Sequence, residues 1–351
     1  MKKSLIALAV LAASGAAMAQ SSVTLFGIVD TGFAYVDNAS GNDSVYGLST
    51  SGNATSRLGF RGVEDLGGGL KAGFWLEGEI FGDDGNAAGF NFKRRSTVSL
   101  AGGFGEVRLG RDLAPGYSKT SSYDLFGQVG IGQFMGWSNW NGNNQTTANN
   151  NNDANGIRSS NMISYYTPNF SGFTAGLGYG FDEQTSGKAG RYVGGYVAYE
   201  NGPLGVAVSY DQRNLAADVD RNALTVAGSY DLNVVKLNAI VQQTKDDVPG
   251  ASDRKVNAYA LGASAPIGAG EVKLQYALYD QKAIDSKAHQ ISLGYVHNLS
   301  KRTALYGTVA YLKNKDASNL SLAAKNLGSD LTGPGAGENQ TGVQLGIRHS
   351  F

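Results

Sequence analysis

Basic side chains alternate with apolar ones in residues 56–66, a spacing that suits the binding of anions. If this segment is a strand, Leu58 and Phe60 share one face, and Arg57 and Arg61 share the opposite face. Guanidinium groups on the wall of a narrow, water-filled passage attract anions, and rings of Arg or Lys are typical of anion-selective pores. The segment therefore indicates a basic wall that meets water and small anions.

Residues 92–101 repeat this pattern. Lys93 and Arg95 lie opposite the face that is shared by Ser96, Val98 and Leu100. Arg94 is out of phase with this alternation, so it lies either near the membrane rim or on a bulge that turns it inward. The pattern predicts that Lys93 and Arg95 point to the same interior as the arginines of residues 56–66.

A third basic position and one acid complete the predicted site. Arg158 precedes the next segment that runs in the same direction, so Arg57, Arg95 and Arg158 are expected at similar depth on neighbouring strands. Asp124, in the long segment before Arg158, is a further expected constriction residue, next to Leu125, which stands where an acid would be expected on the opposite side. Alternatively, the arginines pair with Asp112 or Asp124 and tether a loop, a role that arginine also fills well and that can coexist with anion attraction.

Other chemistries find little support in the residue types. The chain has no cysteine, which excludes disulfides and thiolate metal sites. Residues 102–105 resemble a phosphate loop only in their glycines, because no strand–helix unit follows them. The histidines are scattered along the chain at His289, His297 and His349. We therefore predict no enzymatic activity, no cofactor and no metal site.

Short alternating segments run through the whole chain and must position these side chains. Turns of a few residues alternate with longer loops, which is typical of a transmembrane β-barrel with short periplasmic turns and long outer loops. The predicted strands are residues 23–36, 56–66, 71–81, 92–101, 106–110, 161–170, 173–181, 191–200, 204–213, 222–232, 235–245, 255–265, 271–280, 289–299, 303–313 and 341–351. A barrel of about sixteen strands encloses an aqueous lumen.

Composition supports this all-β, antiparallel membrane barrel. Charged residues make up 17% of the chain, and 50 of its 351 residues are glycine, against about 25% and about 7% in soluble proteins. No stretch that follows the N-terminal segment is apolar for the ~18 residues that a membrane helix needs. A soluble protein with this alternation would need one very large β-sandwich.

The N-terminal segment predicts export. Residues 1–19 contain two lysines, a short apolar run and Ala17-Met18-Ala19, as in a secretory signal peptide. The mature protein is then a single barrel domain of residues 20–351 in the outer membrane of a Gram-negative bacterium. Acidic and basic residues nearly balance, with 29 of each in the full chain, which disfavours a nucleic-acid partner.

Residues 112–157 interrupt the alternation and are predicted to form a constriction loop. The first part carries enough apolar side chains to pack against another part of the protein, whereas residues 141–155 are almost entirely polar. A connection of this length is usually functional or disordered. We predict that its first part folds into the lumen. A surface loop that caps a soluble sandwich is the alternative.

The last segment, residues 341–351, predicts how the barrel closes. Val343, Leu345 and Ile347 share a face with the terminal Phe351. Pairing this strand with residues 23–36 would remove an open edge, which is otherwise an aggregation risk. A C-terminal strand that ends on Phe resembles the signal read by the outer-membrane assembly machinery.

Four segments together resemble the general porins of Gram-negative bacteria, in particular those of β-proteobacteria. These segments are VTLFGIVD at 23–30, SRLGFRG at 56–62, TPNFSGF at 167–173 and GIRHSF at 346–351. The resemblance runs from the signal peptide to the last residue. It implies a homotrimer of sixteen-stranded barrels, each with its third outer loop folded inward. Many enteric members carry Pro-Glu-Phe-Gly in that loop, but residues 124–127 read Asp-Leu-Phe-Gly here.

These observations predict a diffusion porin that passes small hydrophilic solutes and prefers inorganic anions. Its other expected partners are outer-membrane lipid, lipopolysaccharide and the assembly machinery. Two alternatives stay open: a channel selective for phosphate or organic acids, and a non-conducting barrel that serves as an adhesin or receptor.

Overall fold

The computed structural model describes most of the chain. The signal peptide predicted for residues 1–19 lies outside the described residues, as does the polar segment 141–155. The described residues are 22–40, 43–87, 89–137, 157–215, 219–250, 253–322, 327 and 333–351.

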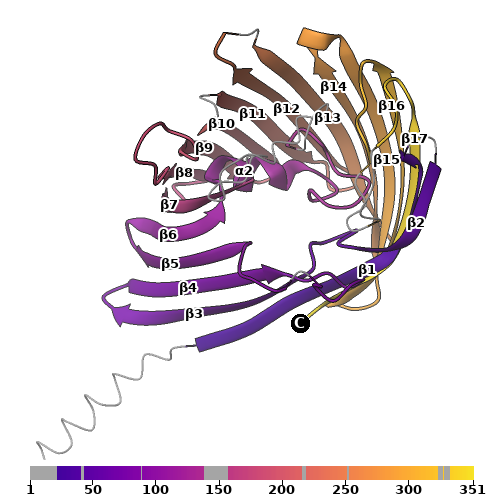
Figure 1. The fold of residues 1–351 in the computed structure, drawn as a ribbon. Helices are drawn as coiled ribbons and strands as arrows, with labels where there is room; N and C mark the ends of the chain where they lie inside the picture. Colours follow the sequence, from indigo (N-terminus) through magenta and orange to yellow (C-terminus); the bar gives the residue numbers. More distant parts are fainter. Residues whose placement is uncertain are drawn as a thin grey trace, which may run out of the picture.

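Seventeen strands form one antiparallel sheet that closes on itself (Figure 1). They are β1 (Ser22–Ser40), β2 (Asp43–Thr50), β3 (Arg57–Gly67), β4 (Leu70–Glu79), β5 (Arg95–Gly102), β6 (Gly105–Leu113), β7 (Arg158–Tyr166), β8 (Phe173–Gly180), β9 (Tyr192–Asn201), β10 (Leu204–Asn214), β11 (Asp220–Asp231), β12 (Lys236–Asp247), β13 (Arg254–Ile267), β14 (Gly270–Gln281), β15 (Ser286–Asn298), β16 (Thr303–Asp316) and β17 (Gln340–Ser350). Because β2 and β3 pair with successive parts of β1, they share one position, and the barrel has sixteen positions. The predicted barrel is confirmed.

The predicted strands leave residues 37–55 as a loop, and this is wrong for residues 37–40 and 43–50, which lie in strands. β1 continues to Ser40 and forms a hairpin with β2, in which Tyr35 pairs with Tyr46 and Phe33 with Leu48. Tyr46 and Leu48 alternate with Gly47 and Ser49, so the strand pattern is present but short. The surrounding Asn, Ser, Gly and Asp residues mask it, because they are typical of turns.

The two faces of the sheet differ as the alternation predicts. The outer face exposes large apolar side chains, among them Val98, Leu177, Leu261 and Leu345, each more than half exposed. The inner face carries buried polar side chains such as Gln242, Gln290, Gln340 and Gln344. An apolar exterior around a polar interior is the reverse of a soluble domain and suits a barrel in lipid.

The described first part of the long connection between β6 and β7, residues 114–137, lies inside the ring of strands (Figure 1). It begins with α2 (Pro115–Thr120), which contacts β8, β9, β10 and β11, and continues through a 3-10 turn, η1 (Ser121–Tyr123). A second 3-10 turn, η3 (Lys282–Ile284), joins β14 to β15. Within the described residues, we find no helix with the length and hydropathy needed to cross a membrane.

Inward-facing side chains of the far wall hold this connection. Asn238 Nδ2 donates to the backbone oxygen of Tyr123 at 3.1 Å, and Lys273 Nζ donates to that of Leu125 at 3.0 Å. Further along, the backbone N–H of Met135 donates to the Tyr279 hydroxyl at 2.9 Å. We call residues 115–137 the inner loop.

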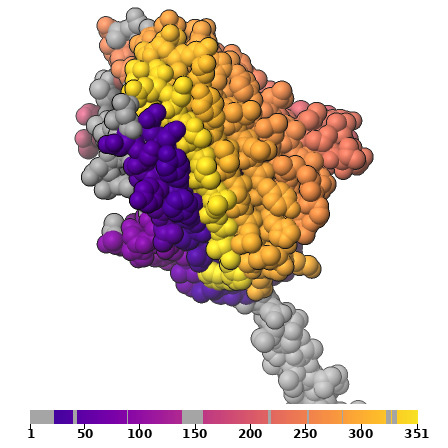
Figure 2. Space-filling view, turned by 90° about the vertical axis from the view of Figure 1, so that its right-hand side faces the viewer, coloured from indigo at the N-terminus to yellow at the C-terminus, as the bar shows by residue number. Residues whose placement is uncertain are grey.

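The first and last strands close the barrel side by side (Figure 2). Their register runs from Ile28 opposite Ser350 to Val36 opposite Gly342. Beyond it, the backbones of Gly27 and Phe351 exchange two hydrogen bonds, of 3.1 and 3.0 Å. The Phe351 ring covers Gly27, where a Cβ atom would collide with it.

Deleting Phe351 is expected to reduce the amount of assembled barrel strongly. The deletion removes the two backbone hydrogen bonds to Gly27 and the last residue of the predicted assembly signal, whereas its ring is 42% exposed and adds modest packing. The measurement is the amount of heat-modifiable barrel in isolated outer membranes. Phe351→Tyr keeps an aromatic end and should assemble normally, and normal assembly of the deletion would refute the signal.

Candidate functional site

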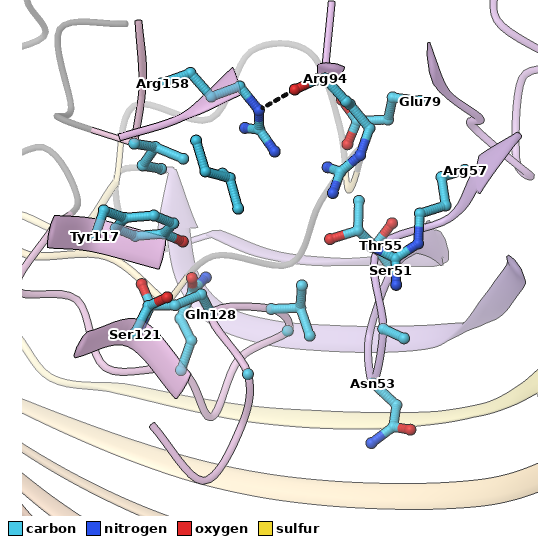
Figure 3. Close-up of a pocket in the computed structure, with 17 residues that line it drawn as sticks. Ser51, Asn53, Thr55, Arg57, Glu79, Arg94, Tyr117, Ser121, Gln128 and Arg158 are labelled. Carbon is cyan, nitrogen blue, oxygen red and sulfur yellow. Dashed lines mark hydrogen bonds between the residues drawn. The ribbon is translucent and has the colours of Figure 1, made fainter. Parts of the chain in front are cut away.

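A cavity of about 570 Å³ lies between the inner loop and the wall formed by β3 to β7 (Figure 3). Its wall side is formed by Arg57, Glu79, Arg94 and Arg158. Its loop side includes Tyr117, Ser121, Gln128 and Gln133, and a third side is formed by residues 51–55. Three cationic side chains and one carboxylate thus line this space, a formal balance of two positive charges.

Glu77, which does not itself line the cavity, orients two guanidinium groups of this wall. Its Oε1 accepts a hydrogen bond from Arg94 Nε at 2.6 Å and lies 3.8 Å from an Arg57 nitrogen. Arg158 Nε donates to the backbone oxygen of Arg94 at 2.9 Å, the contact dashed in Figure 3. Because one carboxylate is shared by Arg57 and Arg94, it holds both in place while neutralising only one charge.

The structure places Arg94, and not Arg95, beside Arg57 and Arg158. Arg95 has the predicted inward orientation, since it pairs with Glu77 in the β4–β5 register, but it does not line the cavity. Its guanidinium lies 4.5 Å from the Trp75 ring centroid and 3.4 Å from Asp112. Arg95 therefore pairs with Asp112, as in the alternative in which the arginines contact carboxylates and tether a loop.

Arg94 escapes the alternation because it precedes β5. Its backbone N–H donates to the backbone oxygen of Glu77 at 3.1 Å. Its side chain, 12% exposed, turns toward the Glu77 carboxylate. Of the two possibilities for Arg94, the structure shows the inward one. The cause is the irregular backbone before the strand and not a bulge within it.

The other two predicted basic residues lie apart from the cavity. Lys93 Nζ is 3.2 Å from Glu79 Oε2 and 5.1 Å from the Phe81 ring centroid. Arg61 lies beside the rings of Phe26 and Trp75, four residues beyond Arg57 along β3.

Asp124 does not line the cavity either, contrary to its predicted place. Its carboxylate is buried within the inner loop, where it accepts hydrogen bonds from Gln128 N at 2.8 Å and Gln275 Nε2 at 3.0 Å. The backbone N–H of Phe134 also donates to it at 3.3 Å. Burial raises the pKa of the Asp124 carboxyl, and these hydrogen bonds oppose that rise. Asp124 thus organises the loop and does not oppose the arginines across the passage.

Sequence reasoning missed the acids of the wall, although a signal for them exists. Trp75, Glu77 and Glu79 alternate with Phe74 and Leu76 in β4, so the spacing that identified Arg57 also places both glutamates inward. Glu79 lines the cavity and pairs with Lys93. This ion pair reduces the attraction of the Glu79 carboxylate for cations in the cavity.

A turn at residues 51–56, also missed, forms the third side of the cavity. The Asp30 carboxylate accepts hydrogen bonds from the backbone N–H groups of Gly52, Asn53 and Ala54 at 3.2, 2.9 and 2.6 Å. The Tyr306 hydroxyl donates to the same carboxylate at 2.6 Å. This cradle of backbone donors fixes the turn inside the barrel, where its side chains face the inner loop.

The inner loop and this turn meet at two glycines. Gly130 has φ +66° and lies so close to the backbone oxygen of Gly52 that a Cβ atom would collide with it. Only glycine combines that backbone conformation with that closeness. The contact joins the loop side and the turn side of the cavity. Tyr117 also lies on the loop side, where burial raises the pKa of its phenol to about 12 and keeps it neutral.

Comparisons with known proteins agree with this architecture. Residues 5–317 match the family described as Gram-negative porin. Outer membrane porin protein 32 of Delftia acidovorans is 67% identical, with all of both chains covered. The solved anion-selective porin from Comamonas acidovorans is 64% identical with a TM-score of 0.89, covering 95% of this chain and 100% of that one.

A more distant structure shares the fold alone. The trimer form of OmpT from Vibrio cholerae has 13% identity and a TM-score of 0.69, covering 94% of this chain and 99% of that one. A trimeric outer-membrane protein thus exists on this fold. The family match and the Delftia relative, with the closed barrel and its inner loop, establish that this chain belongs to the Gram-negative porins, the outer-membrane β-barrel channels that its sequence resembles.

Proposed function

We propose that this porin is a passive diffusion channel for small hydrophilic solutes that prefers anions. The observation that carries the proposal is the wall of Arg57, Arg94 and Arg158, which faces a cavity with one carboxylate, Glu79. Two unit charges 4 Å apart interact by about 1 kcal/mol even in bulk water, and more strongly in a narrow lumen. The Comamonas relative, which is an anion-selective porin, supports the same preference.

The narrowest part of the path is proposed to lie at this cavity. The inner loop, part of the predicted constriction loop 112–157, forms one side, and Arg57, Arg94 and Arg158 form the other. Lys93, Arg61 and Arg95 then contribute to the field along the wall without lining the narrowest point. This arrangement favours a conducting channel over a plugged barrel.

The assembled channel is proposed to be a homotrimer of the mature chain 20–351. The trimeric OmpT structure supports this state on the level of the fold. The exposed apolar residues of the outer face would then divide between subunit contacts and outer-membrane lipid, including lipopolysaccharide.

The wild-type channel is expected to show a zero-current potential of the anion-selective sign across a salt gradient in a planar bilayer. The preference should weaken at high salt, because ~1 M salt shortens the Debye length to ~3 Å. Organic acids or phosphate added at low concentration should leave the open current steady if diffusion is non-specific. A cation-selective potential would overturn the proposed function, and block by one solute would favour a selective channel.

A further inference from the structure

Arg61 is held on the inner wall by two aromatic rings. Its guanidinium carbon lies 5.2 Å from the Phe26 ring centroid and 5.1 Å from that of Trp75. The two rings meet edge to face, with centroids 4.9 Å apart. Cations are attracted to aromatic rings at such distances, so the rings of β1 and β4 hold the cation of β3 beside them.

No acid neutralises this cation among the residues that the structure describes. Arg57, Arg94 and Arg95 have carboxylate oxygens at 3.8, 2.6 and 3.4 Å, whereas no described carboxylate forms an ion pair with Arg61. The Arg61 side chain is also exposed, in contrast to Arg94. A guanidinium has five N–H donors, more than contacts with two rings can use.

The position of Arg61 separates it from the cavity. It lies four residues beyond Arg57 toward the short-turn end of β3, about 13 Å at ~3.3 Å per residue. Trp75 nevertheless joins the two places, because its Nε1 donates to Glu77 Oε2 at 3.1 Å while Glu77 holds Arg94. The Arg95 guanidinium, 4.5 Å from the Trp75 ring, adds a second cation beside the same indole.

We propose that Arg61, held by Phe26 and Trp75, is a second binding station for small inorganic anions, on the short-turn side of the cavity. This inference rests on the proposed function, since anions must reach the lumen. An anion that leaves the arginines of the cavity meets another fixed cation instead of bare wall. Unlike Arg57 and Arg94, which contact Glu77, the Arg61 station attracts anions without a described carboxylate that competes for its N–H groups.

Trp75 makes the Arg61 station measurable, because its indole is partly exposed beside the cation. The sequence contains only two other tryptophans, Trp137 and Trp140. Changing both to Phe leaves Trp75 as the single tryptophan of the chain, whose emission is selected over that of the tyrosines by long-wavelength excitation. Phe at position 137 keeps a ring beside Tyr117 and Phe134. Quenching by iodide then reports the local concentration of an anion, and quenching by acrylamide reports access alone.

In this background, Arg61→Gln is expected to lower the iodide quenching constant of Trp75 about twofold or more at low salt, because one unit charge at contact is removed. The acrylamide constant should stay unchanged, and the iodide difference should shrink as salt shortens the Debye length. Arg61→Lys keeps the charge and should retain most of the iodide quenching. Lys236→Gln is the matched control, since Lys236 is exposed and shares the inward face of β12 with Asn238 on the far wall.

Equal iodide constants in the Arg61→Gln channel and in its parent would overturn the Arg61 station. An equal decrease in the Lys236→Gln channel would also overturn it, because the effect would then come from the overall charge of the lumen. Both outcomes are independent of the zero-current potential. A cation-selective wild type would therefore contradict the proposed function, and equal quenching would contradict the Arg61 station.

Discussion

Changing Arg57 and Arg94 together to Gln is expected to abolish most of the anion preference of the channel. Each lost charge weakens anion attraction by at least ~1 kcal/mol, which is about fivefold in relative permeability for each arginine. The double change also leaves Glu77 without the two arginines that it contacts at 3.8 and 2.6 Å. An uncompensated carboxylate beside the passage attracts cations, so the selectivity is expected to approach or cross neutrality.

The zero-current potential across a salt gradient measures this change, and circular dichroism checks that the strand content is kept. Arg95→Gln is the matched control, because Arg95 follows Arg94 directly but stacks on Trp75 and pairs with Asp112. It should shift the potential much less. A triple variant that adds Glu77→Gln should recover part of the anion preference. A double variant with unchanged selectivity would show that these arginines are structural.

The sequence alone predicted which side chains of the regular wall point inward. Side-chain direction in a strand depends only on the parity of the position. Leu58 and Phe60 therefore indicated the orientation of Arg57 and Arg61, and Val98 and Leu100 that of Arg95. Parity has no meaning outside a strand, and Arg94 lies one residue before β5 begins. Its direction depends on a hydrogen bond to the neighbouring strand, which no local pattern encodes.

The remaining parts of the cavity depend on contacts between distant parts of the chain. The turn at residues 51–56 is fixed by Asp30, more than twenty residues earlier, and Asp30 in turn contacts Tyr306, 276 residues away. Asp124 contacts Gln275, which is 151 residues away. A single sequence shows that these residues are polar and face inward, but it does not show which of them meet.

Asp124→Ala is expected to loosen the inner loop while the barrel stays intact. The carboxylate collects hydrogen bonds from the backbone N–H groups of Gln128 and Phe134 and from Gln275 on β14. Each buried donor that loses its acceptor costs about 1–3 kcal/mol. The strand pairing of the barrel does not involve Asp124, so the effect should be confined to the loop.

The population of displaced loop is expected to rise about fivefold or more, since ~1.4 kcal/mol is tenfold in an equilibrium. Single-channel recordings should show this as larger open-channel noise and as additional conductance levels. Asp124→Asn keeps one acceptor oxygen and should give an intermediate effect. Asp231→Ala is a distant control, because Asp231 caps an exposed turn. A quiet Asp124→Ala channel with wild-type conductance would show that other contacts hold the loop.

Acidification should not reproduce the noise of the Asp124→Ala channel. Burial raises the pKa of Asp124 above its usual value of 3.8, while hydrogen bonds from Gln128 and Gln275 lower it in part. A carboxyl with a raised pKa takes up a proton more readily in the folded loop than in the displaced one. Protonation, as the pH falls through that raised pKa, therefore favours the folded loop. Noise that grows on acidification in wild type but not in Asp124→Ala would contradict this sign, and with it the view that burial dominates at this carboxyl.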